Sequence, residues 1–325
     1  MIKYKYQETE RIRNLIIEIE ALKIVFGSQR ILPQIEQNLR RESLLRSAVF
    51  SARVEGNPVT IDRIDDVEYL HKLEVNNLLT TYNFINSNLA PRNLSVSFIK
   101  KIHKKVMKGL SVNAGYYRNE PWAIFNQAGV AVFLAPAHFS VPKLMDDLLI
   151  EIRNMKYKPQ IKSAIFQFLF EKIHPFADGN GRVGRLISNF IMKIDGYGFR
   201  GLVSMEEAID QKKELYYQAL EPNINLTSFV EFYLEAFISQ ANKMLDQISN
   251  LSEPSREGLL TPRRKEIVLV IKDHPYCTFD FISRRFSRLN FKTLHYDVKK
   301  LCDMGYIVKI GKTRGSTYIA KEPQT

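Results

Sequence analysis

The segment HPFADGNGRVGR, residues 174–185, places a histidine, an aspartate, three glycines and two arginines within twelve positions. Gly179, Gly181 and Gly184 have no side chains, so backbone N–H groups can approach an anion closely at this point. A helix that begins near Gly181 would direct its free amides and the positive end of its dipole at the same anion. The segment therefore predicts a polyphosphate site at a helix N-terminus.

The charged side chains of this segment suit the chemistry of such a site. Arg182 and Arg185 are three residues apart, so they share one face of the first helical turn and can fork onto phosphate oxygens. Asp178 is suited to holding a Mg²⁺ ion that the phosphates then share. His174 is the group able to take a proton near neutral pH. We predict a phosphate cradle with a general base at its rim.

Two better-known glycine motifs, the dinucleotide-binding fingerprint and the P-loop, also bind phosphates. The three glycines satisfy the G-x-G-x-x-G spacing of dinucleotide-binding folds, which requires a preceding strand. The preceding residues, IKSAIFQFLFEKIHPF, place Ser163, Gln167 and Glu171 four apart, which is typical of a helix face. A Rossmann site is therefore disfavoured. A P-loop is excluded, because no Gly-Lys-Ser/Thr follows the glycines.

Helical periodicity extends through most of the first 250 residues, so we expect a mainly α fold. One exception is the stretch PWAIFNQAGVAVFLAP, residues 121–136, whose apolar runs at 122–125 and 130–134 predict a β-hairpin around Gly129. The stretch 249–262, rich in Ser, Pro, Glu and Gly, predicts a linker. The expected helices of the body are 6–26, 35–55, 62–88, 95–110, 143–155, 162–174, 182–194, 206–220 and 227–250.

The last fifth of the chain is a basic module. Residues 261–325 hold 14 Lys or Arg against 6 Asp or Glu, while the whole chain has a net charge of +12. Helices are expected at 263–272, 278–286 and 291–304, and two strands within 306–320. This order resembles a winged helix, and it would place four basic side chains of the third helix near a DNA groove. They are Lys292, His295, Lys299 and Lys300.

Composition excludes several other classes of protein. The apolar fraction of 45% and the charged fraction of 25% match a soluble globular protein. The first apolar stretch, residues 12–26, is interrupted by charged residues, so neither a signal peptide nor a membrane span is expected. Two cysteines, Cys277 and Cys302, fit the reducing cytoplasm.

The twelve residues 174–185 resemble the signature of the Fic family, His-Pro-Phe-x-Asp/Glu-Gly-Asn-Gly-Arg-x-x-Arg, at every signature position. The resemblance covers about residues 35–236 and implies an all-helical bundle with a small β-hairpin flap. We expect an N-terminal helical region at 1–90, a catalytic core at 91–248, the linker at 249–262 and a winged-helix-like domain at 263–325.

The resemblance also implies an activity, the transfer of AMP from ATP to a Ser, Thr or Tyr hydroxyl of a protein. His174 would deprotonate that hydroxyl, and Asp178 would hold Mg²⁺ between the α- and β-phosphates. The backbone at Ile124, Phe125 and Asn126 would align the target segment by strand-like pairing. The implied ATP-binding residues are Gly179, Asn180, Gly181, Arg182, Val183, Gly184, Arg185, Tyr216, Tyr217 and Asn223.

Residues 51–56, SARVEG, resemble the inhibitory motif that one class of this family carries upstream of its signature. The motif consists of Ser51, Glu55 and Gly56. Glu55 is expected in the last turn of a helix, where a carboxylate opposes the helix dipole unless a cation offsets it. The resemblance implies that this cation is Arg185, so Glu55 would reach into the ATP site and deny Arg185 to the γ-phosphate.

Three alternatives remain at the level of sequence. The chain could be a DNA-binding regulator that only senses a nucleotide, since the basic module motivates that function. It could be a Fic enzyme with another phosphate-containing donor, or one that removes AMP. The C-terminal domain is equally suited to DNA and to a protein partner, and a homodimer is compatible with the sequence.

Overall fold

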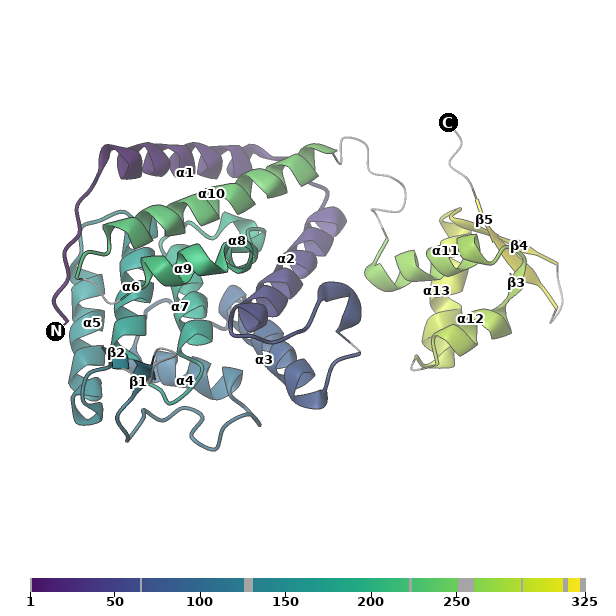
Figure 1. Ribbon diagram of the computed structural model, residues 1–325. Coiled ribbons are helices and arrows are strands. Elements are labelled where there is room, and N and C mark those ends of the chain that lie inside the picture. Colours follow the sequence, from purple (N-terminus) through teal and green to yellow (C-terminus); the bar gives the residue numbers. More distant parts are fainter. Residues whose placement is uncertain are drawn as a thin grey trace. The chain divides into compact units, whose positions relative to one another are not determined.

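The computed structural model describes residues 2–64, 66–125, 131–221, 224–250, 260–287, 289–311 and 315–321. It is mainly helical, as predicted (Figure 1). The chain forms two compact units. One contains Met1–Gln29 and Arg40–Asp246, and the other contains Arg30–Leu39 and Gln247–Thr325. Most of the predicted linker, at 251–259, lies outside the described residues.

The helices of the first unit begin where the sequence supplies caps. The Thr9 hydroxyl accepts a hydrogen bond from the amide of Ile12, and Ser95 does the same for Phe98. The first four α-helices are α1 (Glu10–Ser28), α2 (Pro33–Val54), α3 (Tyr69–Asn86) and α4 (Val96–Val106). The helix expected over 62–88 is shorter than predicted, because a 3₁₀ turn at Ile61–Arg63 precedes α3.

Helices α5 (Val141–Asn154), α6 (Pro159–Ile173) and α7 (Asn180–Ile194) follow the hairpin, and α6 and α7 pack together along their length. Helix α6 is buried nearly all round, which explains its run of apolar residues. Across this pair, the Ser163 hydroxyl donates to the Ser188 carbonyl over 2.7 Å. The pair forms the centre of the first unit and carries the signature segment at its junction.

The helix expected over 206–220 is in fact two helices, α8 (Met205–Gln211) and α9 (Lys213–Ala219). Lys212 between them has φ −119° and ψ 37°, which is outside the helical region, so the axis changes there. Helix α10 (Thr227–Asn250) then lies against α1 (Figure 1), where the Thr9 hydroxyl donates to Glu231 over 2.8 Å.

The predicted hairpin is present. Strands β1 (Ala123–Phe125) and β2 (Ala131–Leu134) pair antiparallel, with Ala123 opposite Leu134 and Ile124 opposite Phe133. The register shifts between Ile124 and Phe125. Residues 126–130, between the two strands, lie outside the described residues. This hairpin is called the flap below.

The second unit contains α11 (Pro262–Asp273), α12 (Phe279–Arg285) and α13 (Phe291–Asp303), and a three-stranded antiparallel sheet. The sheet order is β3-β5-β4, from β3 (Cys277–Thr278), β4 (Ile307–Ile310) and β5 (Thr317–Ala320). The three helices and two of the strands were predicted, but β3 was not. Its two residues are too few for a periodic pattern, and they pair only because Thr317 and Tyr318 lie beside them.

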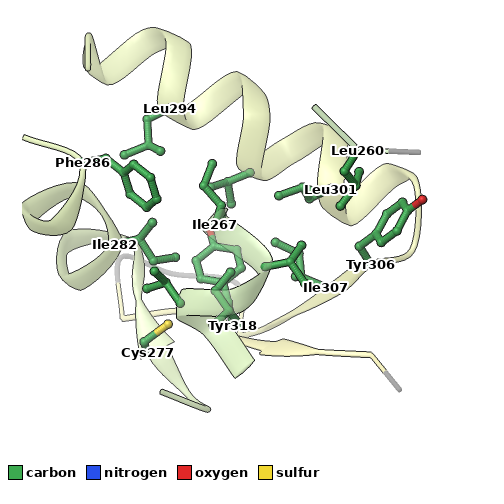
Figure 2. Close-up of a cluster of buried hydrophobic side chains, with 14 residues drawn as sticks. Leu260, Ile267, Cys277, Ile282, Phe286, Leu294, Leu301, Tyr306, Ile307 and Tyr318 are labelled. Carbon is green, nitrogen blue, oxygen red and sulfur yellow. The ribbon is translucent and has the colours of Figure 1, made fainter. Parts of the chain in front are cut away.

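The second unit has its own hydrophobic core. Figure 2 shows side chains from all three helices and from the sheet converging on it. Its members include Ile267, Ile282, Leu294, Leu301 and Ile307, each no more than 1% exposed. A separate core of this kind indicates an independently packed module. Within the described ranges of both units, no helix combines the length and apolar character that a bilayer crossing requires.

Candidate active site

The signature segment forms the loop between α6 and α7. Gly179 caps α7 with φ +80°, and a Cβ atom there would lie 2.7 Å from the sulfur of Met107. Both the conformation and the close approach of α4 therefore require glycine. The Asn180 amide accepts from the Phe176 N–H over 2.9 Å and donates to the Phe176 carbonyl over 2.8 Å. Asn180 thus braces the loop from within, and its side chain is not directed at a ligand.

The start of α7 opens into a cavity of about 580 Å³. That volume lies within the roughly 300–1,000 Å³ range of small-molecule sites. The first turn of a helix has amides without intrahelical acceptors, so the cavity floor attracts anions. The lining residues include His174, Asp178, Gly179, Asn180, Gly181, Glu55, Tyr216 and Tyr217 from the predicted set.

His174 lies at the rim of this cavity, directly after α6. Burial lowers the pKa of its imidazole to about 4, while a hydrogen bond with the Glu171 backbone opposes this shift. The Arg118 cation lowers the pKa further, and Glu55 and Asp178 raise it. The imidazole is therefore neutral at physiological pH, which is the form able to accept a proton.

Arg185 is fully buried and is bound to the end of α2. Its Nη2 donates to Glu55 Oε1 over 2.8 Å and to the Ser51 carbonyl over 2.9 Å, and its Nε donates to the Ser51 hydroxyl over 3.1 Å. Burial alone would lower the pKa of Arg185, but the Glu55 carboxylate together with Tyr216 and Tyr82 outweighs burial, and the pKa is raised. The structure thus brings together Ser51, Glu55 and Arg185. Arg185 Nη1 has no hydrogen-bond partner among the described residues.

The Glu55 carboxylate also lies against the start of α7. Helix α2 ends at Val54, one residue earlier than expected, and Gly56 follows Glu55 with φ +95°. A Cβ atom added to Gly181 would collide with the Glu55 carboxylate, whose Cδ would be 3.1 Å away. The side chain is 30% exposed, on the cavity side. Glu55 therefore occupies space beside amides that an anionic ligand would also approach.

Asp178 and Arg182 are bound to each other. Asp178 Oδ1 accepts from the Gly179 N–H and from Arg182 Nη2, both over 2.6 Å. Arg182 Nη1 donates to Glu74 of α3, also over 2.6 Å, and the Arg182 side chain is 8% exposed. Arg182 is thus held between two carboxylates and does not line the cavity. The Asp178 side chain is 65% exposed at the cavity wall, where a carboxylate suits Mg²⁺ shared with phosphates.

The predicted aromatic pair, Tyr216 and Tyr217, also lines the cavity. Tyr216 is buried, and its hydroxyl accepts from Gln167 Nε2 over 2.9 Å. Tyr217 is partly exposed, and its hydroxyl donates to the Val54 carbonyl at the end of α2 over 3.0 Å. Burial raises the pKa of Tyr217 to about 12, so its hydroxyl stays protonated. Tyr217 therefore links the cavity wall to the helix that carries Glu55.

The remaining predicted residues are placed differently. Val183 is buried in the core of the unit and does not reach the cavity. Gly184 gives room to Glu171, since a Cβ atom there would lie 2.9 Å from Glu171 Oε1. Ile124 and Phe125 lie in β1. Two predicted residues, Asn126 and Asn223, lie outside the described residues.

Several side chains around the cavity were not found from the sequence. Trp122 of the flap stacks on His174, and Glu171 and Lys172 of α6 line the cavity wall. Burial raises the pKa of Glu171 to about 8 and lowers that of Lys172 to about 8. In the sequence, Glu171 and Lys172 stand three and two residues before His174. Both also fit the polar face of an ordinary helix, so their positions did not identify them as site residues.

His103 of α4 supports the loop from beneath. Its ring stacks on Phe176 with centroids 3.7 Å apart and planes 3° from parallel. Its Nδ1 accepts from the Gly115 N–H over 2.8 Å, so a neutral ring must donate from Nε2 to the Asp178 carbonyl, 3.0 Å away. Burial lowers the pKa of His103 to about 4, in agreement with the neutral form.

Comparison with known proteins agrees with this geometry. Residues 93–192 match the model of the Fic/DOC family. A probable protein adenylyltransferase of Aquifex aeolicus is 28% identical over 56% of this chain, and a Fido domain-containing protein of Dictyostelium discoideum is 34% identical over 29%. The matches cover 60% and 64% of these relatives, so the chain spans less than two thirds of either one.

A solved structure resembles the whole chain. The crystal structure of a Fic family protein from Desulfovibrio desulfuricans superposes with a TM-score of 0.68 and 25% identity, and each chain is covered completely. The similarity therefore includes the C-terminal unit as well as the first unit.

Proposed function

We propose that this chain is a protein adenylyltransferase of the Fic/DOC family, which transfers AMP from ATP to a hydroxyl of a protein target. The observation that carries the proposal is the arrangement of His174 beside the amides of Gly179–Gly181 in one cavity. A neutral imidazole and an anion-binding helix start are the two components that in-line attack on a phosphate requires. The names of the relatives support the same activity.

In this reaction His174 accepts the proton of the target Ser, Thr or Tyr hydroxyl. The hydroxyl oxygen then forms a bond to the α-phosphorus, and the bond from that phosphorus to the bridging oxygen of pyrophosphate breaks. Pyrophosphate leaves with the electron pair. A positioned base of this kind usually contributes roughly 10²–10⁴-fold in rate.

The remaining groups bind and orient the nucleotide. The amides at Gly179–Gly181 face the α- and β-phosphates, and Tyr216 and Tyr217 border the nucleoside. Asp178 would hold Mg²⁺, which neutralises charge on the phosphates when it is bound. Arg182, which pairs with both Asp178 and Glu74, orients the Asp178 carboxylate.

The flap offers a docking edge for the target. Strands β1 and β2 form a two-stranded ladder, so each has one edge without a neighbouring strand in that sheet. An extended target segment can add to such an edge by main-chain hydrogen bonds. The backbone around Ile124 to Asn126 would align the acceptor hydroxyl with His174 by this means.

The contact between Glu55 and Arg185 supports autoinhibition. While Glu55 holds Arg185, this arginine cannot bind the γ-phosphate, and the carboxylate repels phosphates from the start of α7. ATP bound in this state would present its α-phosphorus in an orientation unsuited to attack. Release of Glu55 would remove the acidic partner of the guanidinium, whose Nη1 already lacks a partner in the described part of the chain.

Transfer from ATP labelled on the α-phosphate tests the proposal. The Glu55→Gly protein is incubated with cell lysate, and modified proteins are identified by mass spectrometry. The matched control is Glu55→Gly with His174→Ala, assayed beside ATP affinity. We expect transfer only with the histidine present, and ATP affinity within a few-fold in both. Equal labelling by the two proteins would remove His174 from the role of base.

A second function belongs to the C-terminal unit, which we propose to be a winged helix that binds DNA or a protein. Its three helices, its small antiparallel sheet and its positive charge support this. Electrophoretic mobility shift with duplex DNA distinguishes the two partners.

The two cysteines are unpaired, which supports a cytoplasmic location. Gel filtration tests whether the protein is a homodimer.

A further inference from the structure

His174 has a backbone conformation that needs support from elsewhere in the fold. It follows the last residue of α6 with φ 48° and ψ 61°, in the left-handed region. For a residue with a Cβ atom, this conformation is roughly 1–2 kcal/mol less stable than the right-handed one. The bend is what turns the imidazole out of the helix and toward the cavity. Other parts of the structure must therefore hold the bend in place.

Arg118 supplies part of this support. Its Nε donates to the His174 carbonyl over 2.7 Å, and its own N–H donates to the Pro175 carbonyl over 2.9 Å. The side chain is buried, at 5% exposed, and burial lowers the pKa of its guanidinium. The carbonyls at a helix C-terminus carry partial negative charge, which suits a cation at this position.

The same guanidinium also holds both ends of the flap. Its Nη1 donates to the Glu120 carbonyl over 2.9 Å, and its Nη2 donates to the Pro136 carbonyl. These two residues flank the hairpin on either side. Arg118 therefore joins the base of the flap to the residue that carries the imidazole.

Trp122 adds a side-chain contact between the flap and His174. Its carbonyl accepts from the Ala135 N–H over 3.0 Å, which closes the base of the hairpin. Its ring stacks on the His174 ring, with centroids 3.5 Å apart and planes at 23°. Phe133 packs edge-on against the same indole, with centroids 6.4 Å apart. The indole thus covers one face of the imidazole, while the edges that carry the nitrogens stay outside the stack.

We propose that Trp122 is a positioning residue for His174: its indole fixes the rotation of the imidazole and shields one face from water. Arg118 holds the backbone on which both rings depend. This inference rests on the proposed function, because it assigns Trp122 a role only if His174 is the base. A freely rotating imidazole would spend less time aligned with the acceptor hydroxyl, and kcat would therefore be lower.

The stack also affects the titration of His174. Burial is the main cause of its low pKa, and Trp122 contributes to that burial. The charged groups that face the imidazole are Arg118, Glu55 and Asp178, and the side chains of Glu171 and Lys172 line the same cavity. Removal of the indole leaves all of these in place and admits water. The pKa of His174 should then rise toward its ordinary value of 6.5.

The kinetic test compares Trp122→Ala and Trp122→Phe in the Glu55→Gly background. For Trp122→Ala we expect a loss of kcat of tenfold or more, a KM for ATP changed less than threefold, and an acidic limb of the kcat/KM profile moved to higher pH. Trp122→Phe keeps a ring and should be intermediate. Melting temperatures confirm that each variant is folded. An unchanged kcat and an unmoved acidic limb in folded Trp122→Ala would overturn the inference.

The spectroscopic test uses the fact that Trp122 is the single tryptophan of the chain. A protonated imidazole in contact accepts an electron from excited indole and quenches it. We therefore expect emission to fall as the pH is lowered toward the pKa of His174, about 4, and this titration to disappear in His174→Ala. An identical titration in both proteins would overturn the contact. A Glu55→Gly protein without any transfer would overturn the proposed function and the inference together, whereas activity that survives loss of the indole overturns the inference alone.

Discussion

In the proposed mechanism, Arg185 is the residue at which inhibition and catalysis compete. It is fully buried, and Glu55 Oε1 lies 2.8 Å from its Nη2. A hydrogen bond between charged groups contributes about 1.5–3 kcal/mol. A difference of this size corresponds to roughly 10- to 100-fold in an equilibrium constant. A single contact of this strength is therefore sufficient to keep most molecules in the inhibited state.

Glu55→Gly should raise AMP transfer by roughly 10- to 100-fold, since it removes the contact and its contribution. Transfer from labelled ATP, to the chain itself and to lysate proteins, measures the change. The matched control is Glu68→Gly, which removes an exposed carboxylate at the start of α3 and should have no effect. Equal transfer by wild type and Glu55→Gly would contradict the inhibitory role and leave the transferase proposal standing.

The two buried histidines predict a dependence of stability on pH. Burial lowers the folded-state pKa of both His103 and His174 to about 4, from an ordinary value of 6.5. Between these values the unfolded chain binds protons that the folded chain does not, so stability falls as the pH is lowered from about 6.5 to 4. Denaturation midpoints measured at steps through this range check the slope.

His103→Gln should reduce that slope by the contribution of one proton, because glutamine does not titrate. Its amide can still donate to the Asp178 carbonyl, so the loop keeps one of its two supports. The control variant is His274→Gln, at an exposed histidine of the second unit. A slope unchanged by His103→Gln would mean that His103 is not buried in its neutral form.

At the scale of elements, the end of α2 is held by α8 and α9. Arg53 Nε donates to Asp210 over 2.9 Å, Tyr217 donates to the Val54 carbonyl, and Lys213 Nζ donates to the Arg53 carbonyl over 3.4 Å. These contacts fix the last turn from which Glu55 projects. If Glu55 inhibits as proposed, the strength of inhibition depends on how firmly this helix end is packed, as well as on the ion pair itself.

Asp210→Asn should weaken this packing and raise AMP transfer up to about fivefold, the factor that corresponds to the ~1 kcal/mol upper value for a partly exposed ion pair. The effect should disappear in the Glu55→Gly background, where no inhibitory contact remains to be weakened. The control is Glu214→Gln, an exposed carboxylate of α9. The same increase in both backgrounds would show that Asp210 acts on activity by another path.

At the scale of the whole molecule, the chain consists of two units with separate cores. The second unit contains a fully buried carboxylate, Asp297 of α13, which accepts from Arg263 over 2.6 Å and from Arg264 over 2.8 Å. Hydrogen bonds to a buried charge stabilise more than exposed ones, because the charge is otherwise left unsolvated. These bonds join α13 to α11 inside the second unit.

Asp297→Ala should destabilise the second unit by about 1–3 kcal/mol, the usual cost of losing hydrogen bonds to a buried charged group. Self-modification in the Glu55→Gly background should be unchanged, because the catalytic cavity is lined by the first unit alone. Urea denaturation followed by circular dichroism, beside the transfer assay, measures both quantities. Asp303→Ala, on the exposed side of α13, is the control. A parallel loss of activity would show that the units are not independent.

The sequence by itself determined the phosphate loop, because the residues that build it are neighbours. Gly179 provides the left-handed cap, Asn180 closes on Phe176 four residues earlier, and Asp178 accepts from the next amide. Helical periodicity likewise determined most of the helices, and two short apolar runs around Gly129 predicted the hairpin. These features depend on interactions within a few residues, which a pattern records directly. The inhibitory pair of Glu55 and Arg185 came from family resemblance, and their 2.8 Å contact came from the structure.

Only the tertiary structure decided which distant side chains surround the histidine. Arg118 lies 56 residues before His174, Trp122 lies 52 before it, and Glu74 lies 108 before the Arg182 that it holds. In sequence they are an ordinary arginine, tryptophan and glutamate. Their roles arise because the packing of α6 and α7 against the flap, α3 and α4 brings them within 4 Å of the site, and no local pattern encodes a contact between separate elements.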